Sequence, residues 1–173
     1  SSQIKKEKIN MHTIFNHVKM IAENGFAKDI KFYERFDPSL PDVDANKDLI
    51  IQVFLNLIKN SSEAIRRNAT EGEITLSSSF LSSVRISLPT TNKKIELPLC
   101  FSIEDNGGGI SEKTMAHIFE PYFTTKHKSV GTGIGLYMSY DIIVNHMKGK
   151  LYAKNTQKGA KLFIELPIDK RVE

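Results

Sequence analysis

Two asparagines, Asn56 and Asn60, stand four positions apart in a largely apolar stretch. On a helix this spacing places both side chains on one face, about a turn apart, so the two amides can converge on one ligand. A solvated polar face is the simpler interpretation. However, neighbours such as Val53, Phe54 and Leu57 predict a buried helix, in which an unpaired amide costs about 1–3 kcal/mol. Amide oxygens suit a hard cation such as magnesium, which completes its octahedron with phosphate oxygens and water.

The run from Asp105 to Gly109 reads Asp-Asn-Gly-Gly-Gly and follows a strand-like stretch. Each glycine inside a regular element costs about 0.5–1 kcal/mol relative to alanine, so three in succession need a reason. Asn106-Gly107 is typical of a hairpin turn, but a two-residue turn does not require two further glycines. Without Cβ atoms the backbone can approach a flat ligand. The carboxylate of Asp105 can then accept a hydrogen bond from an exocyclic amine such as adenine N6.

The run from Gly131 to Leu136 reads Gly-Thr-Gly-Ile-Gly-Leu and stands where a helical pattern begins. Glycines at a helix N-terminus expose backbone N–H groups in a positive potential, which suits phosphate. The run does not match the dinucleotide-binding fingerprint, because Leu136 stands where that motif needs its last glycine. The P-loop fails because Gly149-Lys150 is followed by Leu151. A nucleotide site at this position therefore belongs to another fold.

The segment from Phe119 to Ser129 is first aromatic and then polar and basic. Core packing explains Phe119 and Phe123 equally well. The hydrophilic stretch from Lys126 to Ser129 lies between this aromatic anchor and the second glycine run. Such an arrangement is typical of a mobile lid that brings cations to phosphate oxygens.

Hydrophobic periodicity predicts the elements that carry these clusters. Apolar residues three and four apart predict helices over 11–24, from 46 or 48 to about 68, near 112–118 and over 133–146. Alternation predicts strands at 30–36, from 74 onward, 84–88, 95–103, 150–155 and 160–166. The sum is an α/β fold: a two-layer sandwich in which a mixed, mostly antiparallel sheet carries its helices on one face.

Composition narrows the class of protein. The 173 residues, 40% of them hydrophobic, suit one compact domain, or a domain plus a short appendage. The 24 Lys and Arg against 20 Asp and Glu are scattered, which disfavours nucleic acid as a partner. The single cysteine allows no disulfide framework and fits a reducing cytoplasm. No apolar run approaches the roughly 18 residues that span a bilayer. Because the chain opens with serine, it is interpreted as a piece of a longer product.

In order and spacing, the four clusters resemble the catalytic and ATP-binding domain of sensor histidine kinases, in the superfamily shared with gyrase, Hsp90 and MutL. Asn56 to Asn60 is similar to the family's N box, Asp105 to Gly109 to its first glycine box, Phe119 to Phe123 to its F box, and Gly131 to Leu136 to its second glycine box. The resemblance covers residues 28 to 168 and implies the Bergerat α/β sandwich. It also implies a division of the chain. Residues 28–173 are expected to form the catalytic domain. Residues 1–27 are expected to hold the end of a dimerisation and phosphotransfer region, with its second helix reaching Ile9, and a linker helix.

The resemblance implies roles for individual residues, with ATP and Mg²⁺ as cofactors. Asn60 is similar to the magnesium ligand, and Asp105 to the adenine-binding aspartate. Hydrolytic relatives have a glutamate where this chain has Asn56. Because an amide cannot take a proton from water, the γ-phosphoryl group is kept for another acceptor. The implied catalytic residues are Asn56, Asn60 and Lys126. The implied nucleotide-binding residues are Asn60, Asp105, Gly107, Gly109, Ile110, Phe119, Thr125, Lys126, Gly131, Thr132, Gly133, Gly135 and Leu136.

Glu63 departs from the family pattern, since many sensor kinases place Lys or Arg three residues after the second asparagine of the N box. Together with Asp37-Pro-Ser-Leu-Pro41 and Gln52 to Ile58, this departure is similar to the nitrogen-regulatory (NtrB-like) subgroup. The cation for the phosphates is therefore expected from Lys126 or Lys128.

No histidine of this chain is followed by an acidic residue, as the family's phosphoacceptor usually is. The resemblance thus implies an acceptor on a dimerisation and phosphotransfer domain of the same kinase, a homodimeric parent protein and a response regulator as downstream partner. Two alternatives remain open. One is an ATPase or clamp of the gyrase and Hsp90 type, which Asn56 disfavours. The other is a protein-binding module with a degenerate nucleotide pocket, which the intact glycine boxes disfavour.

Overall fold

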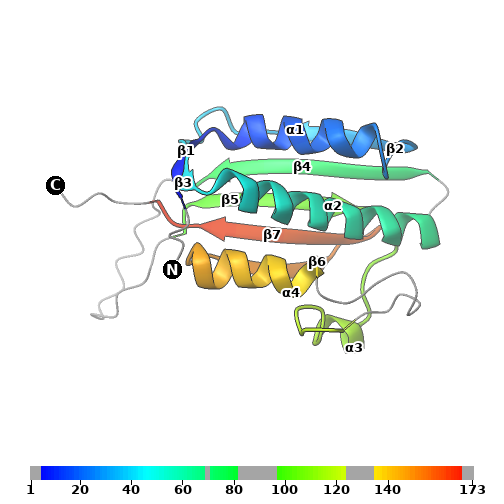
Figure 1. Ribbon diagram of the computed structural model, residues 1–173. Helices are drawn as coiled ribbons and strands as arrows, with labels where there is room; N and C mark the ends of the chain where they lie inside the picture. Colours follow the sequence, from blue (N-terminus) through cyan, green and yellow to red (C-terminus); the bar gives the residue numbers. More distant parts are fainter. Residues whose placement is uncertain (1–4, 69–70, 82–96, 124–134, 169–173) are drawn as a thin grey trace.

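The computed structural model describes residues 5–68, 71–81, 97–123 and 135–168, and within them a five-stranded sheet carries a layer of helices (Figure 1). The strands are β2 (Ile30–Arg35), β4 (Gly72–Phe80), β5 (Leu99–Asp105), β7 (Ala160–Leu166) and β6 (Lys150–Asn155), in that order across the sheet. β2 pairs with β4 in parallel, and the other neighbours are antiparallel. The predicted mixed, mostly antiparallel α/β sandwich is confirmed.

The two longest helices begin at asparagine caps. α1 (Met11–Glu23) follows Asn10, whose side chain accepts a hydrogen bond from the N–H of His12. α2 (Lys47–Asn68) follows Asn46, whose Oδ1 accepts one from Leu49 at 3.0 Å. Each bond satisfies a backbone donor that the first helical turn leaves free. Among the described residues, no helix has the length and apolar character needed to cross a membrane.

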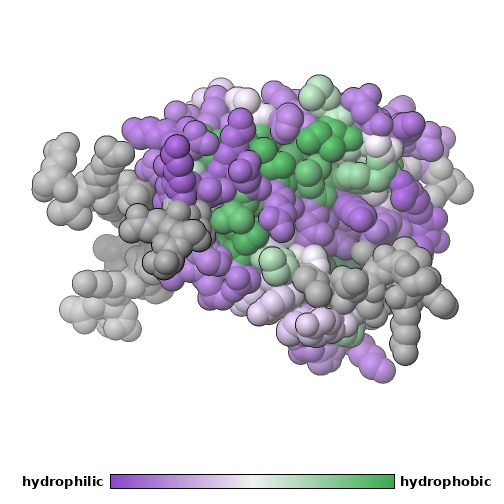
Figure 2. Space-filling view, in the orientation of Figure 1, coloured by the Kyte–Doolittle hydropathy of each residue, from purple (hydrophilic) through white to green (hydrophobic). Residues whose placement is uncertain are grey.

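The hydrophobic core lies between α1, α2 and the sheet. Three fully buried rings form its centre, with the centroid of Phe54 lying 4.5 Å from that of Phe15 and 6.2 Å from that of Phe101. These rings come from α1, α2 and β5, so α1 belongs to the same core as the sheet. The helical face toward solvent is mainly hydrophilic, with an apolar patch over α1 and α2 (Figure 2).

Two short strands, one before α1 and one before α2, are absent from the sequence-based prediction. β1 (Glu7–Ile9) and β3 (Val43–Ala45) pair in antiparallel, with Ile9 opposite Val43. The interpretation of the residues up to Ile9 as the tail of a helix is therefore wrong for Glu7–Ile9. The charged run before Ile9 has no apolar face that could pack as a helix, whereas a strand buries Ile9 and Val43 together. The strand predicted at 84–88 lies outside the described residues.

The last helical segment changes its winding midway. α4 (Gly135–Tyr140) continues into a π-helix, η1 (Asp141–His146), in which the N–H of Met147 bonds to the carbonyl of Ile142 at 3.0 Å. η1 ends at His146, and Lys148, two residues later, has a left-handed φ of 58°. A short helix, α3 (Glu112–Met115), covers part of the predicted 112–118 stretch.

Candidate nucleotide site

α2 carries both asparagines of the first cluster, and both are half-buried. The Nδ2 of Asn56 donates a hydrogen bond of 2.9 Å to the Oγ of Ser139, a buried residue of α4. Asn60 lies one turn further along the same helix. The structure thus places the first cluster against the helix that follows the second glycine run.

Gly135 explains how closely α4 approaches α2. A Cβ built on this glycine would lie only 2.4 Å from the Oδ1 of Asn56, so any side chain here would displace the amide. Gly135 and Leu136 are half-buried at the start of α4. The other predicted residues of the lid and second glycine run lie outside the described residues: Thr125, Lys126, Lys128, Gly131, Thr132 and Gly133.

Asp105, the last residue of β5, is buried and only partly satisfied by hydrogen bonds. Its Oδ1 accepts bonds from the N–H of Gly107 at 2.8 Å and of Ala160 at 3.3 Å. Burial raises the pKa of this carboxyl, and these two bonds oppose the rise. Ser61 of α2 lies close enough to favour the ionised form, yet its buried hydroxyl completes no hydrogen bond within the described part of the chain. A buried carboxylate beside such a hydroxyl fits a polar occupant such as the amine edge of a purine.

The three glycines after Asp105 serve the protein's own packing as well as any ligand. A Cβ on Gly107 would lie 2.8 Å from the backbone of Ala64 in α2. Gly108 and Gly109 have φ of 91° and 83°, a region that other residues rarely adopt. The interpretation of these glycines as space for a ligand alone is therefore incomplete.

Phe119 is half-buried and stacks on Tyr140 of α4, with ring centroids 5.2 Å apart. The ring therefore packs within the protein, in agreement with the packing alternative for this residue. Ile110, another predicted contact, is half-buried after the glycine loop.

Gly159 lies against Asp105 in the structure but is not among the residues predicted from the sequence. A Cβ at this position would lie 2.1 Å from the carbonyl oxygen and 2.6 Å from the Oδ1 of Asp105. In the sequence, Gly159 indicates only the turn between two strands. No local signal links it to a carboxylate 54 positions earlier.

Residues 45–170 match the family model described as histidine kinase-, DNA gyrase B-, and HSP90-like ATPase. The chain belongs to this family. It is 43% identical over 143 residues to the sensory histidine kinase/phosphatase NtrB of Azospirillum brasilense, and 47% identical over 138 residues to NtrB of Rhizobium meliloti (strain 1021). These matches cover 83% and 80% of this chain but only 35% of each relative. The predicted resemblance to histidine kinases is confirmed.

Solved structures agree with this assignment. The catalytic domain of histidine kinase ThkA, in a nucleotide-free form, superposes with a TM-score of 0.74 at 27% identity, covering 94% of this chain and 95% of that chain. ThkA in complex with the response regulator protein TrrA gives a TM-score of 0.69 at 24% identity, covering 96% of this chain and 43% of that chain, which shows the shared fold. The chain is a catalytic ATPase domain of the histidine kinase type.

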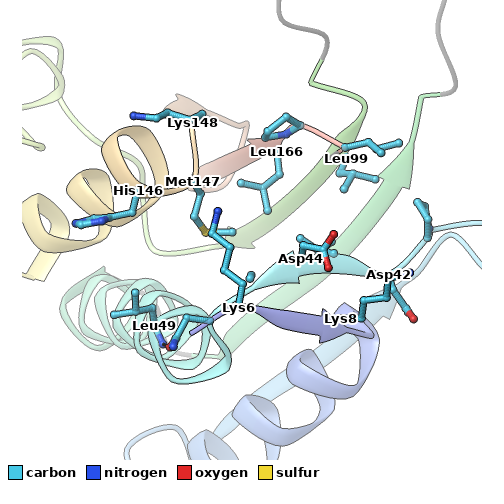
Figure 3. A pocket seen from close by; sticks show the side chains of 16 residues that line it. Lys6, Lys8, Asp42, Asp44, Leu49, Leu99, His146, Met147, Lys148 and Leu166 are labelled. Carbon is cyan, nitrogen blue, oxygen red and sulfur yellow. Dashed lines mark hydrogen bonds between the residues drawn. The ribbon is translucent and has the colours of Figure 1, made fainter. Parts of the chain in front are cut away.

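The domain also has a pocket of about 710 Å³, shown from close by in Figure 3. It opens at the end of β5 opposite to Asp105. The side chains around it include Lys6, Asp44, Leu99 and His146. None of the predicted site residues within the described part of the chain lines this pocket, so it is separate from Asn56, Asn60 and Asp105.

Proposed function

We propose that this domain binds Mg-ATP and transfers the γ-phosphoryl group to a histidine on a dimerisation and phosphotransfer domain outside this chain, in two-component signalling. The supporting observation is the environment of Asn56. Its amide is held by Ser139 and abuts Gly135, at the start of the helix that follows the second glycine run. An amide accepts no proton from water, so this position cannot serve as the general base of a hydrolase.

The base of the nucleotide fits the Asp105 end of the site. The carboxylate has acceptor capacity beyond its two backbone bonds, and Ser61 offers a hydroxyl beside it. An adenine amine would donate to Asp105, and the burial of the carboxylate would strengthen that bond.

The phosphates and the metal would lie toward Asn56 and Asn60 on α2. The amide oxygen of Asn60 would hold Mg²⁺ together with phosphate oxygens, a donor set that this ion accepts. Bound there, the ion would neutralise charge that develops on the transferred group. Lys126 or Lys128 would supply a further cation. Backbone N–H groups for the phosphates would come from Gly131, Thr132 and Gly133.

The proposed partners are supported by the relatives' names. NtrB is described as a sensory histidine kinase/phosphatase, and ThkA is seen with a response regulator. We infer for this chain a homodimeric, cytoplasmic parent kinase with a response regulator as its downstream partner. Residues 1–27 would lead from the phosphotransfer region, with α1 docked on the catalytic domain.

Radiolabelled ATP tests the proposal. With Mg²⁺ and γ-labelled ATP, the chain alone should acquire negligible label, whereas a separately supplied phosphotransfer domain from the same protein should acquire acid-labile label. Release of inorganic phosphate without an acceptor would instead identify an ATPase. Absence of ATP binding in a calorimeter would identify a non-catalytic module. Acid-labile label on the chain by itself would also contradict the proposal.

A further inference from the structure

The side chain of Asn155, the last residue of β6, makes hydrogen bonds with both the backbone N–H and the backbone carbonyl of Ile110. Its Oδ1 accepts a hydrogen bond from the N–H of Ile110 at 2.8 Å, and its Nδ2 donates one to the carbonyl of Ile110 at 2.6 Å. A residue of an adjacent antiparallel strand makes the same double exchange through its backbone. Here a side-chain amide replaces that strand.

The turn that begins at Asn155 touches the glycine loop at two further points. The N–H of Gly108 bonds to the carbonyl of Lys158 at 3.0 Å. Ala160 donates to Asp105, and Gly159 packs against the same residue. Contacts from residues 155 to 160 therefore extend along the loop from Asp105 to Ile110.

This turn is itself firmly closed. The N–H of Thr156 bonds to the carbonyl of Gly159 at 2.8 Å, and the N–H of Gly159 bonds to the Oγ1 of Thr156 at 3.0 Å. The loop also lies tightly against it, since a Cβ on Gly109 would be 3.1 Å from the Oδ1 of Asn155. The turn can thus act as a template for a loop whose glycines have no side chains to fix it.

The clamped loop contributes little to the core. No residue from 104 to 118, all of which are described, belongs to the main hydrophobic cluster, and Asn155 itself is exposed. Loss of the Asn155 bonds should therefore change the shape of the loop more than the stability of the fold.

We propose that Asn155 is a positioning residue for nucleotide binding. Through Ile110 it fixes the glycine loop that lies beside Asp105, so that the loop is already shaped when the base arrives. The inference rests on the proposed function, because it assigns the loop to the base of the nucleotide. Preorganisation of this kind improves affinity by removing the cost of ordering the loop on binding.

Calorimetry with ADP and Mg²⁺ tests the inference on the full chain. Asn155→Ala should bind ADP about tenfold more weakly than the unchanged chain, the expected effect of losing two exposed hydrogen bonds. Gln157→Ala is the matched control, since its exposed side chain lies in the same turn and makes no hydrogen bond with a described residue. The control should bind ADP like the unchanged chain.

Kinetics separate positioning from a general structural role. In phosphotransfer to a supplied acceptor domain, Asn155→Ala should raise the KM for ATP about tenfold and leave kcat nearly unchanged. Its melting temperature without nucleotide should stay close to that of Gln157→Ala. Equal ADP affinity in Asn155→Ala and the unchanged chain would overturn the inference alone, as would a loss of affinity matched by a large drop in melting temperature. Failure of the unchanged chain to bind ADP would overturn the proposed function, and this inference with it.

Discussion

The amide of Asn56 and the hydroxyl of Ser139 are joined by a 2.9 Å hydrogen bond between α2 and α4. The amide of Asn56, which we propose to lie beside the phosphates, is thus oriented by the helix that begins at Gly135. Any displacement of α4 would change the orientation of this amide. Catalysis by positioning requires such an orientation to be held.

Replacing Ser139 with alanine tests this link. The free energy of unfolding should fall by about 1 kcal/mol, because the Nδ2 of Asn56 loses its acceptor in a half-buried position. Phosphotransfer should slow as the amide loses its orientation. Urea denaturation and single-turnover phosphotransfer measure the two effects. Ser77→Ala, a half-buried serine of β4 whose side chain makes no hydrogen bond with a described residue, is the control. Equal stability and equal phosphotransfer rates in the two variants would show that the bond between Asn56 and Ser139 does not contribute to catalysis.

Asn60→Ala tests the metal assignment. ADP affinity should lose its dependence on Mg²⁺, because the amide oxygen is the proposed protein ligand of the ion. Titration calorimetry with and without MgCl₂ measures this dependence, and circular dichroism checks the fold. Lys59→Ala, an exposed neighbour on α2, should keep the dependence. An unchanged response to Mg²⁺ in Asn60→Ala would remove Asn60 as a ligand.

Asp105→Asn should weaken nucleotide binding while the hydrogen bonds within the protein are kept. An asparagine Oδ1 can still accept the bonds from Gly107 and Ala160, but its NH₂ group would face the adenine amine as a second donor. ADP affinity should therefore fall at least about tenfold. Calorimetry with the unchanged chain as reference measures the loss.

The free energy of unfolding of the same variant, compared with that of the unchanged chain, should depend on pH. Burial raises the pKa of Asp105, so the folded chain keeps this proton to higher pH than the unfolded chain. The stability that it contributes is present below its ordinary pKa and is lost as pH rises through the raised pKa. The free energy of unfolding of Asp105→Asn, relative to the unchanged chain, should therefore increase over that acid range and then level off. A relative decrease in urea titrations across this range would contradict the assignment.

Gly159→Ala should destabilise the domain. The new methyl group would meet the backbone of Asp105 at 2.1 Å, and the backbone must shift to admit it. Overpacking of this kind costs about 1–3 kcal/mol. Urea denaturation measures the loss, and the control is Lys158→Ala, since the exposed side chain of Lys158 takes no part in the bond that its carbonyl accepts from Gly108. Comparable stability in the two variants would show that the turn can relax freely.

Local signals in the sequence were sufficient for most elements of the sandwich. Caps such as Asn10 and Asn46 and the alternation along β5 and β7 depend on neighbouring residues, so they can be recognised without a structure. The strand pair β1–β3 could not be recognised, because three residues are too few for a periodic pattern. The π-helix η1 also leaves no distinct pattern, since Ile142 and Ile143 suit an α-helix equally well.

In the candidate site, too, individual residues could be predicted from the sequence, whereas their long-range contacts could not. Asp105 after a strand and Asn56 on a buried helix are predictable because each depends on its own element. The contacts of Asn56 with Ser139 and of Asp105 with Gly159 join residues 83 and 54 positions apart. Contacts over such distances depend on how the elements pack, and one sequence does not encode them as a local pattern.

The docking of α1 restricts where the kinase can pivot. Met11, Phe15 and Val18 are fully buried, and β1 is tied to β3 just before the helix. A hinge within residues 7 to 23 would have to open the core, so the catalytic domain should swing as one body together with α1. Any movement of this domain toward the proposed histidine acceptor should therefore carry α1 along with the bound nucleotide.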